Sequence, residues 1–255
     1  MAKAKKKTVM KKPAAKKSRA VAKTAAGTAR PRRAQGSGLA FGRGPNPARV
    51  AAILRGLQEA YPEATCELKF DNAFQLLIST ILSAQCTDVV VNQVTEKLFL
   101  KYPDAQALAY ANPAELEKEI RPTGFFRNKT KSIMGASKKV LEDFHGEVPR
   151  TMEELLTLPG VARKTANVVL GTAFGIASGV VVDTHVQRLS TRLDLTKNTD
   201  PKKIEQDLMR IIPQDKWIIF SHQLIWHGRR VCNARQPKCL VCNLEKLCYS
   251  KDKTN

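Results

Sequence analysis

LPGVARKTA, residues 158–166, places a Pro-Gly turn between two segments with helical character. A short helix is expected over 151–156 and a longer one over 162–174. Gly160 leaves room for another backbone to approach closely. The first N–H groups of the second helix have no partner within that helix and lie at the positive end of its dipole. The stretch therefore predicts a helical hairpin whose turn can hold a phosphate oxygen.

Two interpretations of this hairpin stay open. It has the layout of a helix–hairpin–helix element, which grips the DNA backbone without reading bases. An ordinary pair of antiparallel helices also favours Pro and Gly in its turn. The nine residues alone do not separate the two.

Helical spacing of apolar residues continues along the chain on both sides of the hairpin. Asn72 is expected to cap a helix over 73–84, and Asn112-Pro113 to begin another that ends at Ile120. The strand-like run Val180–Val182 is too short to build a sheet. The sequence therefore predicts an all-α protein. Further helices are expected over 47–61, 87–102, 130–144, 184–193, 201–212 and 217–229.

Positive charge is concentrated at the N-terminus. The chain has 255 residues and a formal charge of +20, from 43 Lys and Arg against 23 Asp and Glu. Residues 1–44 hold 14 of the basic residues and no acidic one, which leaves 29 basic against 23 acidic residues in the remainder. This Lys/Ala-rich stretch has too few large apolar groups to offset its ordering entropy, so we expect a disordered tail.

The tail has three interpretations: a nonspecific tether to nucleic acid phosphates, a solubility element, or a targeting peptide. The tether is favoured, because like-charge blocks of this size commonly bind nucleic acid. No apolar run is long enough to span a bilayer. We therefore expect no membrane contact and a cytoplasmic protein associated with the bacterial nucleoid, or a nuclear one in a eukaryote.

Four cysteines close the chain: Cys232, Cys239, Cys242 and Cys248. Thiolates at such short spacing favour a metal centre, which would supply folding free energy to a loop with little apolar content. Structural zinc sites usually take their four ligands from two closely spaced pairs, whereas this segment has a single Cys-x2-Cys pair. The spacing therefore favours an iron–sulfur cluster. Zinc and disulfides remain alternatives, the latter weak because the N-terminus has no secretory signal.

A second motif, VDTHVQR, begins at Val182. Asp183 follows an apolar run and precedes a helical segment, so it is suited to an N-cap. Capping is the more common use of an Asp in such a place. The functional alternative is a carboxylate near the end of an apolar segment that faces a cleft. His185 is interpreted as structural, since a single His without partner ligands rarely binds metal.

Three segments together resemble the endonuclease III family of the helix–hairpin–helix superfamily. They are LPGVARKTANVVLGTAFG from 158, VVVDTHVQRLSTRL from 180, and the four cysteines at spacings of six, two and five. ILSAQCTD at 81–88 is similar to a loop of the same family. The resemblance covers about residues 46–250 and implies a DNA glycosylase and lyase with a 4Fe-4S cluster on the four cysteines.

The resemblance also implies a fold of two helical domains that flank a DNA cleft. A six-helix barrel with the helix–hairpin–helix would occupy 66–176. The cluster domain would join 45–65 to 177–255, and 1–44 would stay outside as the basic tail. The expected partner is double-stranded DNA with damaged pyrimidines or abasic sites, bound by a monomer.

The family's chemistry assigns roles to two residues. Lys164 would attack the sugar carbon that carries the damaged base, displace the base and form a Schiff base. An ammonium has no lone pair, so the attacking amine must be uncharged. Asp183 would stabilise positive charge on the sugar and help move protons. β-Elimination would then break the strand 3′ to the lesion.

Other residues are expected to contact DNA. A base inside a duplex must be flipped out, and Gln85 and Phe125 match the family's side chains that fill the gap. Gly160, Ala162 and Arg163 belong to the phosphate-binding hairpin. Lys129 is a further candidate for phosphate contact or exposed charge.

One residue departs from the family pattern. The turn usually reads Gly-Val-Gly, and here Ala162 replaces the second Gly. The change is harmless if Ala162 begins the helix, and weakens the phosphate grip if that position needs a positive φ. Cys66 and Cys86 are expected to be ordinary buried or half-buried thiols.

Two other functions compete with a bifunctional enzyme. A monofunctional adenine or mismatch-thymine glycosylase is disfavoured because such relatives usually lack the amine of Lys164. A non-enzymatic DNA-binding protein is disfavoured because both Lys164 and Asp183 are present.

Overall fold

The computed structural model describes residues 42–254, and this range is helical without any strand. The all-α prediction is confirmed. The α-helices of the range are α1 (Pro47–Ala60), α2 (Ala73–Leu82), α3 (Asp88–Lys101), α4 (Ala105–Ala109), α5 (Pro113–Ile120), α6 (Phe126–Phe144), α7 (Met152–Leu155), α8 (Arg163–Phe174), α9 (Thr184–Arg192), α10 (Pro201–Ile211) and α11 (Trp217–Arg230). The 3₁₀ helices are η1 (Arg121–Thr123), η2 (Gln214–Lys216), η3 (Cys239–Val241) and η4 (Glu245–Leu247).

The predicted disordered tail over 1–44 lies outside the described residues, except for its last three positions. Among the helices of residues 42–254, none is both long and apolar enough to cross a membrane.

Polar caps set several helix starts, two of them as predicted. Asn72 accepts a hydrogen bond from the Gln75 N–H at 2.9 Å. Asn112 accepts one from the Ala114 N–H at 2.9 Å, directly ahead of Pro113. Each cap satisfies a first-turn N–H that has no partner within its helix, and is typically worth about 1 kcal/mol.

Two helices differ from the prediction. α6 begins at Phe126, four residues before the expected Thr130, because a left-handed turn at Phe125 (φ 48°) leads directly into it. α4 was not predicted. Asp104 caps it at 2.8 Å from the Ala107 N–H, but its five residues are too few for apolar periodicity to be visible. The other predicted helices end within one or two residues of their expected bounds.

Buried apolar side chains gather in two clusters. One joins α2, α3, α5, α6 and α8, and the other joins α1, α9, α10 and α11. Fully buried members are Leu76 and Ile133 in the first, and Leu57 and Phe220 in the second. The division into domains at 66–176 and 45–65 with 177–255 stays a prediction, because the described residues 42–254 belong to one compact unit.

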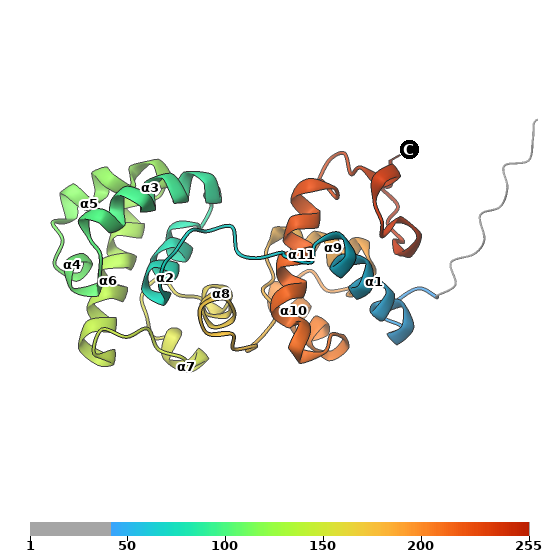
Figure 1. Cartoon of the computed structure of the whole chain (residues 1–255), viewed down its shortest axis with the longest axis horizontal. Coiled ribbons are helices and arrows are strands. Elements are labelled where there is room, and N and C mark those ends of the chain that lie inside the picture. Colours follow the sequence, from blue (N-terminus) through green and yellow to red (C-terminus); the bar gives the residue numbers. More distant parts are fainter. Residues whose placement is uncertain (1–41, 255) are drawn as a thin grey trace, which may run out of the picture. The chain divides into compact units, whose positions relative to one another are not determined.

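Helix α1 packs against elements from the far end of the sequence, beside α11 (Figure 1). Arg49 on α1 is fully buried. Its guanidinium donates to the carbonyl of Gly44 at 2.8 Å and to that of Leu247 at 2.5 Å, and also to the carbonyl of Leu193. These bonds fasten the start of the described chain to the segment that carries the last cysteines.

Candidate active site

The hairpin turn lies between α7 and α8 and depends on Gly160. This residue has a φ of +76°, and a Cβ built on it would lie 2.6 Å from the Cβ of Ser132 on α6. Ala162 has φ −103° and ψ 171° and is the N-cap of α8, so its methyl group is tolerated. No side chain caps α8. Its first N–H groups are therefore open to an anion, as the sequence predicted for this element.

We predict that Gly160→Ala lowers the free energy of unfolding by about 2 to 4 kcal/mol, because positive φ and the contact with Ser132 both oppose a side chain. Urea unfolding measures the change. Gly146→Ala is the matched control, because Gly146 has a φ of +86° with open space around its Cβ position. Equal losses in the two variants would contradict the role given to Ser132.

The residues expected to do chemistry share a cleft of about 680 Å³. Lys164 is the second residue of α8 and is exposed. Asp183 is the N-cap of α9 and is half-buried. Gln85, from the loop between α2 and α3, lies in the same wall. The cleft is lined by Glu67, Ser83, Gln85, Cys86, Thr87, Asp88, Val89, Lys164, Asp183, Thr184, His185 and Arg229.

Asp183 combines the two roles that its sequence position allowed. Its Oδ1 accepts hydrogen bonds from the N–H groups of His185 and Val186, each at 2.8 Å. These bonds fix the carboxylate at the positive end of the α9 dipole. Oδ1 accepts both capping hydrogen bonds, so Oδ2 remains available to a ligand in the cleft.

A charged residue that no sequence motif singled out also lines the cleft. Arg229, near the end of α11, pairs with Asp88 at 2.7 Å and also with Glu67. His185 lies in the same wall, with its Nδ1 at 3.2 Å from an Arg188 nitrogen. Burial lowers the pKa of His185. Tertiary packing alone brings Arg229 to this wall, and no local motif signals it.

Gln85 and Phe125 share an uncommon backbone. Their φ angles are 55° and 48°, in the left-handed region that few non-glycine residues adopt. Both side chains are exposed, and Phe125 has 64% of its surface free. Gln85 lines the cleft, whereas Phe125 does not. Strained residues of this kind cluster at functional sites, where the surrounding structure holds them in place.

Two basic residues have partners inside the protein. Arg163 donates from Nε to Glu205 at 2.7 Å, and Glu205 also accepts from Asn167 at 2.8 Å. Lys129 was expected to be exposed or to contact phosphate, and this prediction was wrong. Only 5% of Lys129 is accessible, and its ammonium binds the carbonyls of Leu82 and Thr123.

All four C-terminal cysteines line one cavity. Arg192 donates to the Sγ of Cys232 at 3.2 Å, and the Nε2 of His227 lies 3.4 Å from the Sγ of Cys242. Burial raises the pKa of Cys242 to about 11. Within residues 42–254, no three His, Cys, Asp or Glu side chains converge tightly enough to hold a single metal ion.

The remaining two cysteines, Cys66 and Cys86, are half-buried free thiols outside this cavity, as expected.

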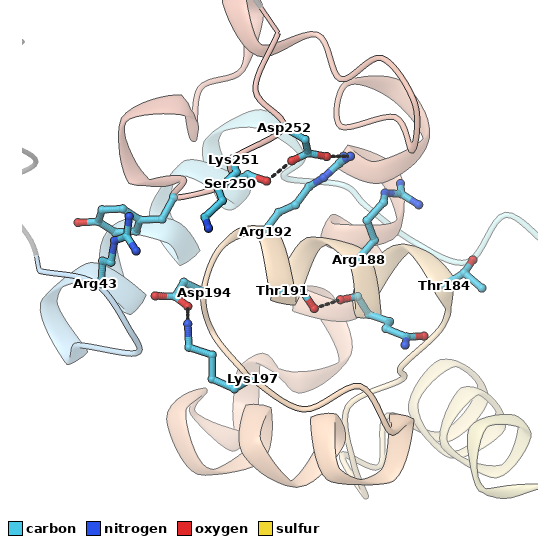
Figure 2. A pocket seen from close by; sticks show the side chains of 12 residues that line it. Arg43, Thr184, Arg188, Thr191, Arg192, Asp194, Lys197, Ser250, Lys251 and Asp252 are labelled. Carbon is cyan, nitrogen blue, oxygen red and sulfur yellow. Dashed lines mark hydrogen bonds and ion pairs between the residues drawn. The ribbon is translucent and has the colours of Figure 1, made fainter.

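A second cavity, of about 610 Å³, follows one face of α9 from Thr184, which also borders the cleft (Figure 2). Five basic side chains line it against two carboxylates. Both carboxylates are paired, Asp252 with Arg192 at 2.5 Å and Asp194 with Lys197. None of the site residues predicted from the sequence lies in this cavity. It forms a basic surface next to the cleft.

Comparison with known proteins identifies the class of protein to which this chain belongs. Residues 78–214 match the HhH-GPD superfamily of base excision DNA repair proteins. Endonuclease III of Synechocystis sp. is 61% identical over 202 residues, which cover 79% of this chain and 92% of that protein. Endonuclease III of Bacillus subtilis is 43% identical over 209 residues, 82% and 95% of the two chains.

Solved structures agree with this class. An endonuclease III in non-covalent complex with DNA superposes with a TM-score of 0.77 at 42% identity, over 80% of this chain and 95% of that one. An endonuclease III trapped in a covalent intermediate with DNA gives 0.77 at 42% identity, over 80% and 96%. The chain belongs to the HhH-GPD superfamily and, within it, to the endonuclease III family. A thermostable thymine-DNA glycosylase, 23% identical with a TM-score of 0.71, shares the fold.

Proposed function

We propose that this protein is a bifunctional enzyme of base excision repair, which removes oxidised pyrimidines from DNA and cleaves the strand 3′ to the abasic site. One observation carries the proposal. Lys164 in the first turn of α8 and Asp183 at the cap of α9 line the same cleft, next to a hairpin with open N–H groups. DNA-bound relatives of the same family agree with a DNA partner.

The reaction begins at the amine of Lys164. Its uncharged Nζ attacks C1′ of the damaged nucleotide, the C1′–N bond breaks, and the base leaves with a proton. Ring opening gives an imine between Lys164 and the sugar. The imine makes the C2′ proton acidic, and its removal expels the 3′ phosphate. Asp183 stabilises the positive charge that develops on the sugar and serves in the proton transfers.

The hairpin and the two left-handed residues bring the nucleotide to that amine. The N–H groups at the start of α8 hold a backbone phosphate, which places Lys164 at a fixed distance along the strand. Gln85 and Phe125 enter the base stack and fill the gap left by the flipped nucleotide. Arg163 supports the hairpin through its ion pair with Glu205. It contacts a phosphate only when that ion pair breaks.

The cysteine cavity suits a 4Fe-4S cluster, bound by Cys232, Cys239, Cys242 and Cys248. Four thiols around one cavity match the ligand set of such a cluster. Arg192 at 3.2 Å from Cys232 provides a cation beside the thiolates. A bound cluster would hold this loop in place. We further propose that the protein acts as a monomer on chromosomal DNA, in association with the nucleoid.

The monofunctional and non-enzymatic alternatives are less well supported. Lys164 has no use in a monofunctional glycosylase, and the thymine-DNA glycosylase is a more distant relative than the endonuclease III structures. A protein that only binds DNA would not need an amine and a carboxylate in one cleft.

Asp183→Asn separates the capping role of Asp183 from its catalytic role. Asparagine accepts the same capping bonds, so we predict a change in unfolding free energy below about 1 kcal/mol. Loss of the negative charge should slow base release by about 10²- to 10³-fold. Urea unfolding and single-turnover base release measure the two effects.

The matched control for this variant is Asp200→Asn. Asp200 caps α10 by accepting from the Lys203 N–H at 3.0 Å and does not line the cleft. It should leave base release unchanged. A similar loss of rate in both variants would show that the effect comes from helix capping.

Removal of residues 1–41 tests the tail as a DNA tether. Arg43 is the last of the 14 basic residues in 1–44, so this truncation removes 13 of them and keeps the hydrogen bonds of Gly44. We predict weaker binding to undamaged duplex and a flatter dependence on salt, by about 0.9 in log–log slope for each phosphate that the protein no longer neutralises. A tail of the same composition in shuffled order should retain the wild-type slope. If the truncated protein also retains it, the tail does not touch DNA.

A further inference from the structure

The buried ammonium of Lys129 connects two separate loops. Lys129 lies in the first turns of α6 and is 5% exposed. Its Nζ donates to the carbonyl of Leu82 at 2.8 Å and to that of Thr123 at 2.7 Å. The two acceptors are 41 positions apart in the sequence. The side chain therefore holds together two segments that no hydrogen bond of a helix would join.

Each acceptor closely precedes one of the left-handed residues. Leu82 is the last residue of α2, three positions before Gln85. Thr123 is the last residue of η1, two positions before Phe125. The ammonium thus contacts both loops at the point where each leaves its helix.

The local electrostatics explain why a cation is buried there. The carbonyl at the end of α2 has no partner in its own helix and lies at the negative end of the helix dipole, which favours a positive charge. Burial lowers the pKa of Lys129, and a coulombic interaction with Cys86 opposes that effect. A hydrocarbon side chain at this position would leave two buried carbonyls without a donor.

We propose that Lys129 is a positioning residue, which fixes the Gln85 loop against the Phe125 loop so that both side chains enter the duplex as one unit. The inference rests on the proposed function, because it assigns both side chains to nucleotide flipping. The same bonds explain how the exposed residues Gln85 and Phe125 keep left-handed backbones. They hold both loops to the buried ammonium of Lys129.

The first test compares two reactions in Lys129→Met, a variant of similar length without donors. Excision of a damaged pyrimidine from a duplex requires flipping of a paired base, whereas β-elimination at a preformed abasic site starts from a nucleotide that leaves the stack easily. With enzyme in excess, we expect excision to slow by about 10²-fold. A loss of this size is typical when a group is displaced slightly from the reacting atoms. β-Elimination should slow by less than about threefold.

Ile133→Ala is the matched control, because Ile133 is fully buried on the same helix, one turn further on. It should weaken the core without touching either carbonyl, and should slow the two reactions equally. Equal slowing in Lys129→Met would overturn the proposal, because a purely structural role predicts it.

Hydrogen exchange gives a readout that needs no reaction. In Lys129→Met the amides of residues 83–88 and 123–126 should exchange faster together, and in Ile133→Ala they should not. Faster exchange in only one loop would overturn the proposal. Absence of both reactions in the wild type would instead refute the proposed function, and would leave the exchange result as a separate test of Lys129.

A double-mutant cycle covers the case in which Lys129→Met does not fold. Gln85→Ala and Phe125→Ala alter exposed side chains in the otherwise wild-type chain. If the two loops act as one unit, their effects on excision should be non-additive, since the loss of one side chain removes the benefit of the other. Additive effects would overturn the proposal.

Discussion

Lys164→Ala should form no covalent adduct with an abasic duplex in the presence of borohydride, while the wild-type protein is trapped. Without the amine there is no imine to reduce, and strand cleavage should fall by on the order of 10⁴- to 10⁶-fold. Gel electrophoresis of the reduced complex measures trapping, and mass spectrometry locates the crosslink. Because Lys164 is exposed in the first turn of α8, its truncation should leave the packing of the core intact.

Lys203→Ala is the control for trapping, because Lys203 is exposed on α10 and does not line the cleft. It should be trapped like the wild type. A crosslink that maps to any residue other than Lys164 would contradict the proposed mechanism. Base release by the wild type without an adduct would point to a monofunctional glycosylase.

Cys239→Ala should yield a colourless and poorly folded protein. A structural metal centre supplies on the order of 10 kcal/mol of folding free energy, which is comparable to the whole stability of a typical domain. The segment around η3 has little else to hold it, since Leu240 and Val241 are 84% and 72% exposed. Visible absorbance, iron content and thermal unfolding measure the effect.

Cys66→Ala provides the comparison, because Cys66 is a half-buried thiol outside the cysteine cavity. It should keep its colour and unfold cooperatively. If Cys239→Ala retained both its colour and full activity, the assignment of Cys239 as a cluster ligand would fail.

Local signals in the sequence predicted most of the fold. Apolar spacing and cap residues such as Asn72 act within one turn of helix, so they are visible without tertiary structure. The same holds for the Pro-Gly turn at Gly160. The cysteine spacing anticipated that four thiols would share a cavity, because the loop between them is short.

Long-range packing decided what the sequence could not predict. Lys129 was expected at the surface because a lysine usually is, and only the carbonyl ends of two other helical segments make its burial favourable. Arg229 reaches the cleft from α11 through pairs with Glu67 and Asp88, more than 140 positions away. Whether Ala162 was harmless depended on its backbone angles, which the sequence alone leaves undetermined.

The bonds of Arg49 have a consequence for the order in which the protein folds on the ribosome. The partner carbonyls of Leu193 and Leu247 are translated 144 and 198 residues after Arg49. Helix α1 therefore emerges early but cannot bury its arginine until synthesis is nearly complete. A nascent chain that stalls before Leu247 should leave α1 accessible to chaperones and proteases. The apolar core around α2 and α6 is already complete at that stage.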